Sequence, residues 1–163
     1  MTQSAVEVKK PEEPEKIEGS VIIDKPVETV WKFVTDLSNA PKWFWDVLEM
    51  RQTSEGPLGA GTKLVNRHAH HPKDFVSAVV SDFEPNRRFT FEITSGPVKG
   101  AQVTISMETI EGKTKLSLAF NFKLSGFYRL MYPFVIGRTR RMGKSVAETS
   151  VAKVKSILES EPH

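Results

Sequence analysis

The feature that most constrains this chain is a change in the period of its hydrophobic pattern. Between residues 62 and 124 apolar residues mostly alternate with polar ones, whereas from residue 146 to 158 they recur at spacings of three and four. The first pattern is typical of strands that bury one face, and the second of a helix that buries one stripe. We therefore expect an α+β fold in which an antiparallel sheet covers a long C-terminal helix.

Turn-forming residues divide the alternating region into separate strands. Glu111, Gly112 and Lys113 form a hairpin signal, and glycine and proline break the pattern at other points. One further strand precedes this region, near the start of the chain. We expect strands over residues 17–23, 48–54, 62–70, 74–84, 89–94, 101–108 and 116–124.

Two short helices are predicted between the first two strands. Pro26 suits a first helical position because its missing N–H would be unpaired there. Val27, Val30, Trp31 and Val34 follow at helical spacing on one face. A second short helix that carries Trp43, Phe44 and Trp45 is expected next, and Asn39 is a plausible cap for it.

The C-terminal helix has a clear apolar stripe and an ambiguous beginning. The stripe consists of Ala147, Val151, Val154 and Leu158. Upstream, Pro133 and Gly137 make a single straight helix through residues 127–137 unfavourable. Either a short turn precedes a helix that begins near Pro133, or a longer helix is kinked at that point.

Length and composition are those of one globular domain. The chain has 163 residues, 39% of them hydrophobic, and it contains no cysteine, which excludes disulfides and thiolate sites. Residues 1–16 are polar and are expected to form a disordered tail, so the domain should span residues 17–161. These first residues also lack the apolar segment of an export signal, and we therefore expect a cytoplasmic protein.

Five short segments resemble one known family. They occur in this order: IIDKPVETVW at residues 22–31 with Asp36, PKW at 41–43, GAGT at 59–62, FEPNRR at 83–88 and VKSILE at 154–159. Together they resemble the polyketide cyclase/dehydrase branch of the START-like (SRPBCC, helix-grip, Bet v 1-like) superfamily. The resemblance implies a curved seven-stranded antiparallel sheet wrapped around the C-terminal helix, with an apolar cavity between them.

The same resemblance sets expectations for function. Members of the superfamily bind lipids, quinones, hormones or polyketides, some cyclise or dehydrate a bound polyketide, and others associate with proteins or ribosomes. No catalytic motif is common to this branch, so no catalytic residue and no cofactor is assigned. The expected ligand-binding residues are Trp45, Arg67, Phe75, Phe91, Val103, Phe120, Phe122, Tyr128, Met131, Tyr132 and Val135.

Each of these assignments has a simpler alternative. The apolar residues could pack against one another and leave no space, because protein interiors are close-packed. Tyr128 and Tyr132, one helical turn apart, could bond a ligand oxygen with their hydroxyl groups or could reach solvent. Arg67 could supply a polar contact, but its strand lacks the alternation that would assign it to a face.

A group of histidines is interpreted as a surface feature. His68 and His70 would share one face of a strand, which is acceptable chelate spacing, but His71 would point away or lie in the turn. No surrounding motif supports a metal site, and none is predicted. Among possible acid–base groups, Asp82, Glu92 and Glu108 fall on the wetter face of their strands.

Basic residues follow the aromatic stretch that begins the last helix. Arg138, Arg140 and Arg141 could contact an anionic membrane surface, or they could form the solvated side of the helix, which we favour. Nucleic acid is not an expected partner, and the oligomeric state is left open.

The primary hypothesis for the function of this chain is a carrier of an apolar or amphipathic small molecule. The alternatives are a polyketide aromatase/cyclase-like enzyme and a protein or membrane interaction module.

Overall fold

The computed structural model describes the backbone of residues 15–96, 98–122 and 127–161, and the side chains of residues 16–96, 98–122 and 141–161. Most of the predicted tail, residues 1–14, lies outside the described residues. The first strand begins at Glu15, two residues before the expected start of the domain.

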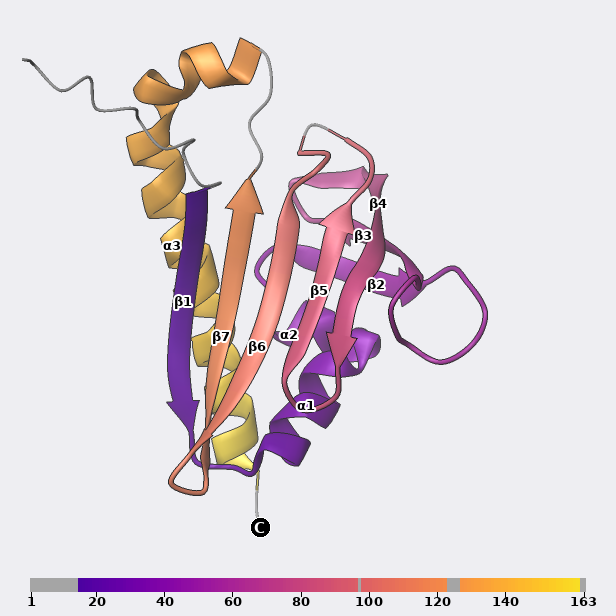
Figure 1. The fold of residues 1–163 in the computed structure, drawn as a ribbon, viewed down its shortest axis with the longest axis vertical. Coiled ribbons are helices and arrows are strands. Elements are labelled where there is room, and N and C mark those ends of the chain that lie inside the picture. The colour runs from indigo at the N-terminus through magenta and orange to yellow at the C-terminus, as the bar shows by residue number, and fades with distance from the viewer. Residues whose placement is uncertain (1–14, 97, 123–126, 162–163) are drawn as a thin grey trace, which may run out of the picture.

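Seven strands form a single antiparallel sheet in the order β1-β7-β6-β5-β4-β3-β2 (Figure 1). This confirms the predicted sheet. The strands are β1 (Glu15–Ile23), β2 (Val47–Gln52), β3 (Lys63–His68), β4 (His71–Glu84), β5 (Arg88–Ile93), β6 (Gln102–Ile110) and β7 (Lys113–Phe122). The first strand pairs with the last, so β1 and β7 lie side by side although they are far apart in the sequence.

The two predicted short helices follow β1. Helix α1 (Val27–Thr35) buries Val30, Trp31 and Val34, which lie on one face because their spacings are close to one helical turn. A 3-10 turn η1 (Leu37–Asn39) leads into α2 (Ala40–Trp43). Asn39 precedes α2 but does not cap it: its Nδ2 donates to the carbonyl of Phe33 at 3.1 Å.

The C-terminal helix α3 (Phe127–Ser160) is continuous, and Figure 1 shows that its first turns run in a different direction from the rest. Of the two alternatives, the longer helix with a bend is therefore the one that the structure shows. The predicted apolar stripe is buried, with Ala147, Val151, Val154 and Leu158 no more than 2% exposed. Helix α3 packs against β1 and β7.

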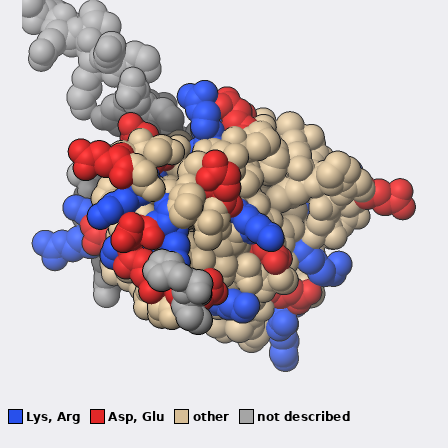
Figure 2. All heavy atoms as spheres, turned by 90° about the horizontal axis from the view of Figure 1, so that it is seen from below, with Lys and Arg blue, Asp and Glu red and all other residues tan. Residues whose placement is uncertain are grey.

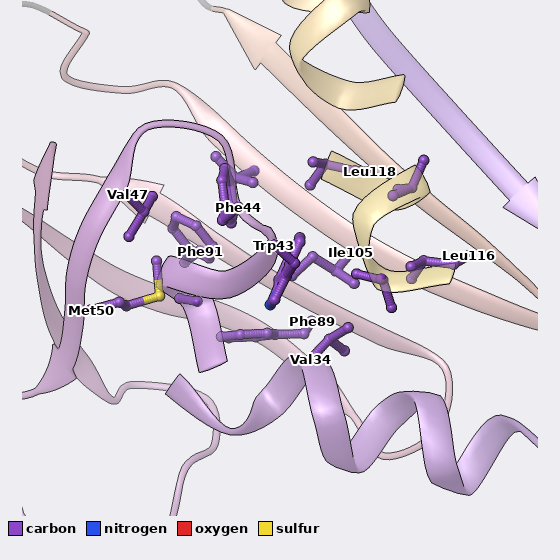
Figure 3. Close-up of a cluster of buried hydrophobic side chains, with 14 of the residues drawn as sticks. Val34, Trp43, Phe44, Val47, Met50, Phe89, Phe91, Ile105, Leu116 and Leu118 are labelled. Atoms are coloured by element: carbon purple, nitrogen blue, oxygen red, sulfur yellow. The ribbon is translucent and has the colours of Figure 1, made fainter. Parts of the chain in front are cut away.

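We call the face of the sheet that meets the three helices the inner face. Its apolar residues and those of α1 and α2 form one continuous core, part of which is shown in Figure 3. The inner-face core residues are Ile23, Met50, Leu64, Ala78, Val80, Phe89, Phe91, Ile93, Val103, Ile105, Met107, Leu116 and Leu118.

A β-bulge interrupts the strict alternation of side chains in β4. The pairing register between β4 and β5 shifts between Val80 and Asp82, which inserts one extra residue into β4. Phe83 therefore lies opposite Phe89 on the inner face, with ring centroids 5.7 Å apart. Phe75 lies on the other side of the sheet, because the bulge separates the two phenylalanines that strict alternation places in one row.

Candidate functional site

Four aromatic side chains form a row across the inner face, which we call the aromatic row. Ring centroids are 4.9 Å apart between Trp43 and Phe44, 6.4 Å between Phe44 and Phe120, and 6.4 Å between Phe120 and Phe122. Trp43 and Phe44 are buried, whereas Phe120 and Phe122 are only half-buried although they pack against the core. The row thus extends from the core to the end of β7 that precedes α3.

Phe91 and Val103, two of the predicted ligand-binding residues, lie in the core beside this row. They are opposite each other on β5 and β6, and they are 1% and 6% exposed. Phe91 lies close to Phe44 and Val47 in the cluster shown in Figure 3. The structure therefore brings Phe91, Val103, Phe120 and Phe122 together on the inner face.

Arg67 and Phe75 lie on the outer face of the sheet. They are Cα partners on β3 and β4, one residue beyond the pair Asn66 and Val76, whose side chains point inward. Phe75 is 50% exposed, and the guanidinium carbon of Arg67 lies 5.9 Å from the centre of its ring. Both are among the predicted ligand-binding residues, and the structure places them on the side of the sheet opposite Phe91, because each is adjacent in its strand to an inward-pointing residue.

Trp45 lies between α2 and β2 and is 42% exposed. Its backbone N–H donates to Oγ of Ser150 on α3 at 3.1 Å, which joins this loop to the helix. The four remaining predicted ligand-binding residues, Tyr128, Met131, Tyr132 and Val135, have side chains outside the described residues. The same holds for Arg138 and Arg140, whereas Arg141 is exposed.

One polar side chain on the inner face has a buried atom without a partner. Asn66, on β3, is 5% exposed, and its Oδ1 makes no hydrogen bond. Its neighbours across the sheet are Met50 and Val76, both apolar. Nε1 of Trp43 is likewise buried and unpaired, as is Nε of Arg67 on the outer face. Buried polar atoms are normally hydrogen-bonded, so the two atoms on the helix-covered side, those of Asn66 and Trp43, need an explanation in terms of that side.

His68 is the next residue of β3 on the same side as Asn66. It is the Cα partner of Val47, which is 5% exposed and belongs to the core. Burial lowers the pKa of His68 below its ordinary value, and the nearby His71 lowers it further. Asn66 and His68 thus place two polar groups, about 7 Å apart along the strand, on an otherwise apolar face.

Sequence reasoning missed Asp46, which is the centre of the histidine cluster. Its Oδ2 is hydrogen-bonded to Nδ1 of His70 and lies 3.9 Å from Nδ1 of His68. Asp46 has a φ of 64°, in the left-handed region that few residues other than glycine adopt. No periodicity in the sequence relates it to the histidines, because the loop before β2 brings it to them.

The histidines themselves are arranged differently from the prediction. His70 lies in the turn after β3 rather than in the strand, so it does not share a strand face with His68, and His71 begins β4. Ring centroids are 5.8 Å apart between His68 and His70 and 4.7 Å between His70 and His71. Within the described part of the chain, no group of three or more His, Cys, Asp or Glu side chains is arranged so that it could hold a metal ion.

The carboxylates considered as acid–base groups lie away from the inner face. Arg88 is hydrogen-bonded to Asp82, and it donates to Oε1 of Glu84 at 2.8 Å. These two carboxylates raise the pKa of Arg88. Glu92 alternates with the buried Phe91 and Ile93 and so lies on the outer face, and Glu108 is exposed.

The arrangement has the sheet, the covering helices and the apolar inner face that the resemblance implies. A family model described as "Polyketide cyclase / dehydrase and lipid transport" matches residues 14–159. The chain belongs to this family. No curated protein sequence matches the chain significantly.

Several solved structures have the same fold as this chain. The crystal structure of TTHA0849 from Thermus thermophilus has a TM-score of 0.69 and 13% identity, and the match covers 90% of this chain and 100% of that one. The solution structure of the Polyketide_cyc-like protein Cgl2372 from Corynebacterium glutamicum has a TM-score of 0.63 and 23% identity, covering 92% of this chain and 94% of that one.

A third similar structure has a biosynthetic context. BexL, a di-domain ARO/CYC from the BE-7585A biosynthetic pathway, has a TM-score of 0.68 and 15% identity. The match covers 89% of this family member but only 46% of BexL. At these identities the likeness establishes the helix-grip fold and not a shared reaction.

Two surface observations bear on partners of this family member. None of its helices, over the described residues, is long and apolar enough to cross a membrane. Figure 2, seen from the lower end of Figure 1, shows acidic and basic side chains interspersed over the visible face. That face therefore carries no large field of one sign that would attract a polyanion.

Proposed function

We propose that this protein binds and carries an apolar or amphipathic small molecule between the inner face of the sheet and α3, without changing it. The observation that carries the proposal is the aromatic row. Phe120 and Phe122 pack against the core, yet they keep part of their surface uncovered at the end of the sheet nearest the start of α3. Family membership supports the same reading, since the family description includes lipid transport.

The physical basis of binding would be the transfer of apolar ligand surface from water. Each Å² of apolar area removed from water contributes roughly 25 cal/mol before ordering costs. Aromatic side chains suit such a site because they offer a large contact area with little conformational freedom to lose. A few polar groups would then orient the ligand.

The test compares two Phe→Ala substitutions on opposite faces of the sheet. The purified full-length chain is titrated with the fluorescent apolar probe N-phenyl-1-naphthylamine, and native mass spectrometry with solvent extraction checks for a retained molecule. Phe120→Ala, within the aromatic row, should weaken probe binding. Phe75→Ala is the matched control, because Phe75 is 50% exposed on the outer face. It should bind the probe as the original chain does.

Two results would count against a carrier. Absence of any saturable probe binding, together with a clean mass and an empty extract, would contradict binding at the inner face. Equal effects of Phe120→Ala and Phe75→Ala would mean that the probe binds elsewhere. A partly reduced affinity in Phe120→Ala alone supports the proposal, provided that circular dichroism shows the fold to be retained.

A second candidate is a cyclase- or dehydratase-like enzyme, favoured by one observation. His68 lies on the inner side of β3 with a lowered pKa, and the carboxylate of Asp46 is 3.9 Å from its Nδ1. A neutral imidazole there could take a proton from the carbon beside a ligand carbonyl and pass it to the hydroxyl group on the next carbon, which would leave as water as the carbon–carbon double bond forms. If so, the chain should convert a β-hydroxyketone to its enone, and His68→Gln should abolish turnover while probe binding persists.

A further inference from the structure

Asn66 differs from the buried threonines Thr90 and Thr114 in its lack of partners. Among the Thr and Ser side chains that are buried, Thr114 donates to the carbonyl of Lys25 at 2.8 Å, and Thr90 bonds Thr104 at 3.0 Å. Asn66 Oδ1 has no such bond. A buried acceptor left without a donor is unfavourable, so its position is explained if a donor arrives from outside the chain.

The surroundings of Asn66 restrict what that donor can be. Its side chain lies on the inner face between Leu64 and His68, and the residues opposite it are Met50 and Val76. No Lys, Arg, Asp, Glu or His is among the fully buried side chains of the described residues. A charged ligand group beside Asn66 would lose its hydration among apolar side chains, and its ionisable neighbour on this face, His68, favours the neutral form because burial lowers its pKa, so the charge would be strongly unfavourable. The group should therefore be neutral.

A hydroxyl group meets these requirements. It donates to Oδ1 of Asn66, and its own oxygen can accept from a nearby donor. Nε1 of Trp43 is a buried donor without a partner, and it belongs to α2, which packs against β2, the strand next to β3. Both unpaired atoms thus belong to buried residues on the side of the sheet that the helices cover, one an acceptor and one a donor.

We propose that Asn66 is a specificity-determining residue, whose Oδ1 accepts a hydrogen bond from the hydroxyl group of a neutral, otherwise apolar ligand. The ligand class is an uncharged alcohol or phenol rather than a fatty acid or another anion. This inference rests on the proposed function, because it assumes that a small molecule binds at the inner face.

The experiment uses three probes that share one apolar frame: biphenyl, 4-hydroxybiphenyl and biphenyl-4-carboxylate. Each displaces N-phenyl-1-naphthylamine from the full-length chain at neutral pH, and dissociation constants follow from the displacement curves. The measured quantity is the ratio of the constants for biphenyl and 4-hydroxybiphenyl. Asn66→Leu should lower this ratio about tenfold, which corresponds to one good hydrogen bond.

Two further variants keep the test specific. Asn121→Leu makes the same chemical change on β7, where Asn121 alternates with the inward Phe120 and Phe122 and so lies on the outer face. It should leave the ratio unchanged. Asn66→Ser keeps a hydrogen-bonding group at the site and should retain part of the preference. Circular dichroism of each variant shows whether it is folded.

The outcomes separate this inference from the proposed function. If biphenyl binds but the ratio is the same in the original chain and in Asn66→Leu, the role of Asn66 is overturned and the carrier proposal stands. Tighter binding of biphenyl-4-carboxylate than of 4-hydroxybiphenyl would overturn the neutral ligand class. If no probe displaces N-phenyl-1-naphthylamine, or if that dye does not bind, the proposed function fails and this inference fails with it.

Discussion

Gly19 of β1 and Ala147 of α3 are so close that no side chain fits between them. A Cβ atom added to Gly19 would lie 2.7 Å from the backbone carbonyl carbon of Ala147 and 2.6 Å from the backbone nitrogen of Glu148. Both are backbone atoms of a helix, which cannot yield as a flexible side chain can. The close approach of β1 to α3 therefore depends on glycine at position 19.

Gly19→Ala should destabilise the protein. Overpacking of this kind costs about 1–3 kcal/mol, and we expect a value near the upper end because backbone must move. For a domain of this size the melting temperature should fall by about 4–10 °C. Thermal unfolding followed by circular dichroism measures this change.

Gly59→Ala is the matched control for that experiment. A Cβ at Gly59 would meet no atom within 4 Å, and its backbone is outside the left-handed region. The melting temperature of this variant should be unchanged or slightly raised, since alanine reduces the freedom of the unfolded chain. An equal loss of stability in both variants would show that the contact between β1 and α3 is not as tight as described.

The order of elements and the buried stripe of α3 could be predicted from the sequence. Ala147, Val151 and Leu158 share a face by helical geometry alone, so a periodic pattern is sufficient to assign them. Alternation in the strands works in the same way until the register changes. The bulge between Val80 and Asp82 is a single extra residue, and no residue type in that segment marks it.

The candidate site was harder to predict because its contacts join distant parts of the chain. Asp46 meets His70 across 24 positions, and the left-handed backbone of Asp46 that makes this contact leaves no signal in the residue pattern. Asn66 occupies an inward position of a strand whose alternation is irregular. A polar residue there cannot be distinguished from a solvent-facing one until the neighbouring strands are known.

Asn66→Leu should stabilise the ligand-free protein, because the side chain with an unpaired buried oxygen is replaced by an apolar one. An unsatisfied buried acceptor costs about 1–3 kcal/mol, part of which should be recovered. Urea unfolding of protein stripped of bound molecules measures the gain. A loss of stability would mean that Asn66 has a structural partner in solution.

Thr114→Val tests the opposite case at a site of equal burial. Thr114 is fully buried, and its Oγ1 donates to the carbonyl of Lys25 at 2.8 Å. Valine has the same shape but leaves that carbonyl without the bond, so the free energy of unfolding should fall by about 1 kcal/mol. The same urea experiment applies, and an unchanged midpoint would indicate that water replaces the threonine hydroxyl.

Glu159 links the end of α3 to the end of β1 and should make stability sensitive to acid. Its Oε1 accepts hydrogen bonds from the backbone N–H of Asp24 at 2.9 Å and from Nζ of Lys155 at 2.6 Å. The bond from Lys155 and then the bond from Asp24 lower the pKa of Glu159 below its ordinary value of 4.5. The stabilisation is therefore present above pH 4.5 and is lost as the pH falls through the lower, folded-state pKa.

Glu159→Gln should remove this part of the pH dependence. The amide oxygen can still accept from Asp24, so the variant should be only slightly less stable near neutral pH, where the ionic contribution of an exposed pair is small. Urea midpoints at neutral pH and at several values below 4.5 provide the comparison. Parallel curves for the two proteins would contradict a role for Glu159 in acid sensitivity.

His68 should make stability depend on pH in a different window. Burial, and then the charge of His71, lower the pKa of His68 below its ordinary value of 6.5, so the unfolded chain binds a proton more readily than the folded chain does. The free energy of unfolding should therefore decrease as the pH falls from 6.5 towards the folded-state pKa, and His68 should have no such effect well above that window.

The measurement is the difference in unfolding free energy between the original chain and His68→Gln as a function of pH. His70, His71 and Asp46 lie around His68 and are present in both proteins, so the comparison changes only the side chain at position 68. The difference should be constant above neutral pH and should shift in favour of the variant as the pH falls below 6.5.

Because His68 and Asn66 share one side of β3, a bound probe that contacts the neutral imidazole should enlarge this pH dependence. Protonation of His68 would then oppose binding of the probe as well as folding. A pH-independent difference would mean that His68 is solvated in the folded protein and is not part of the inner face.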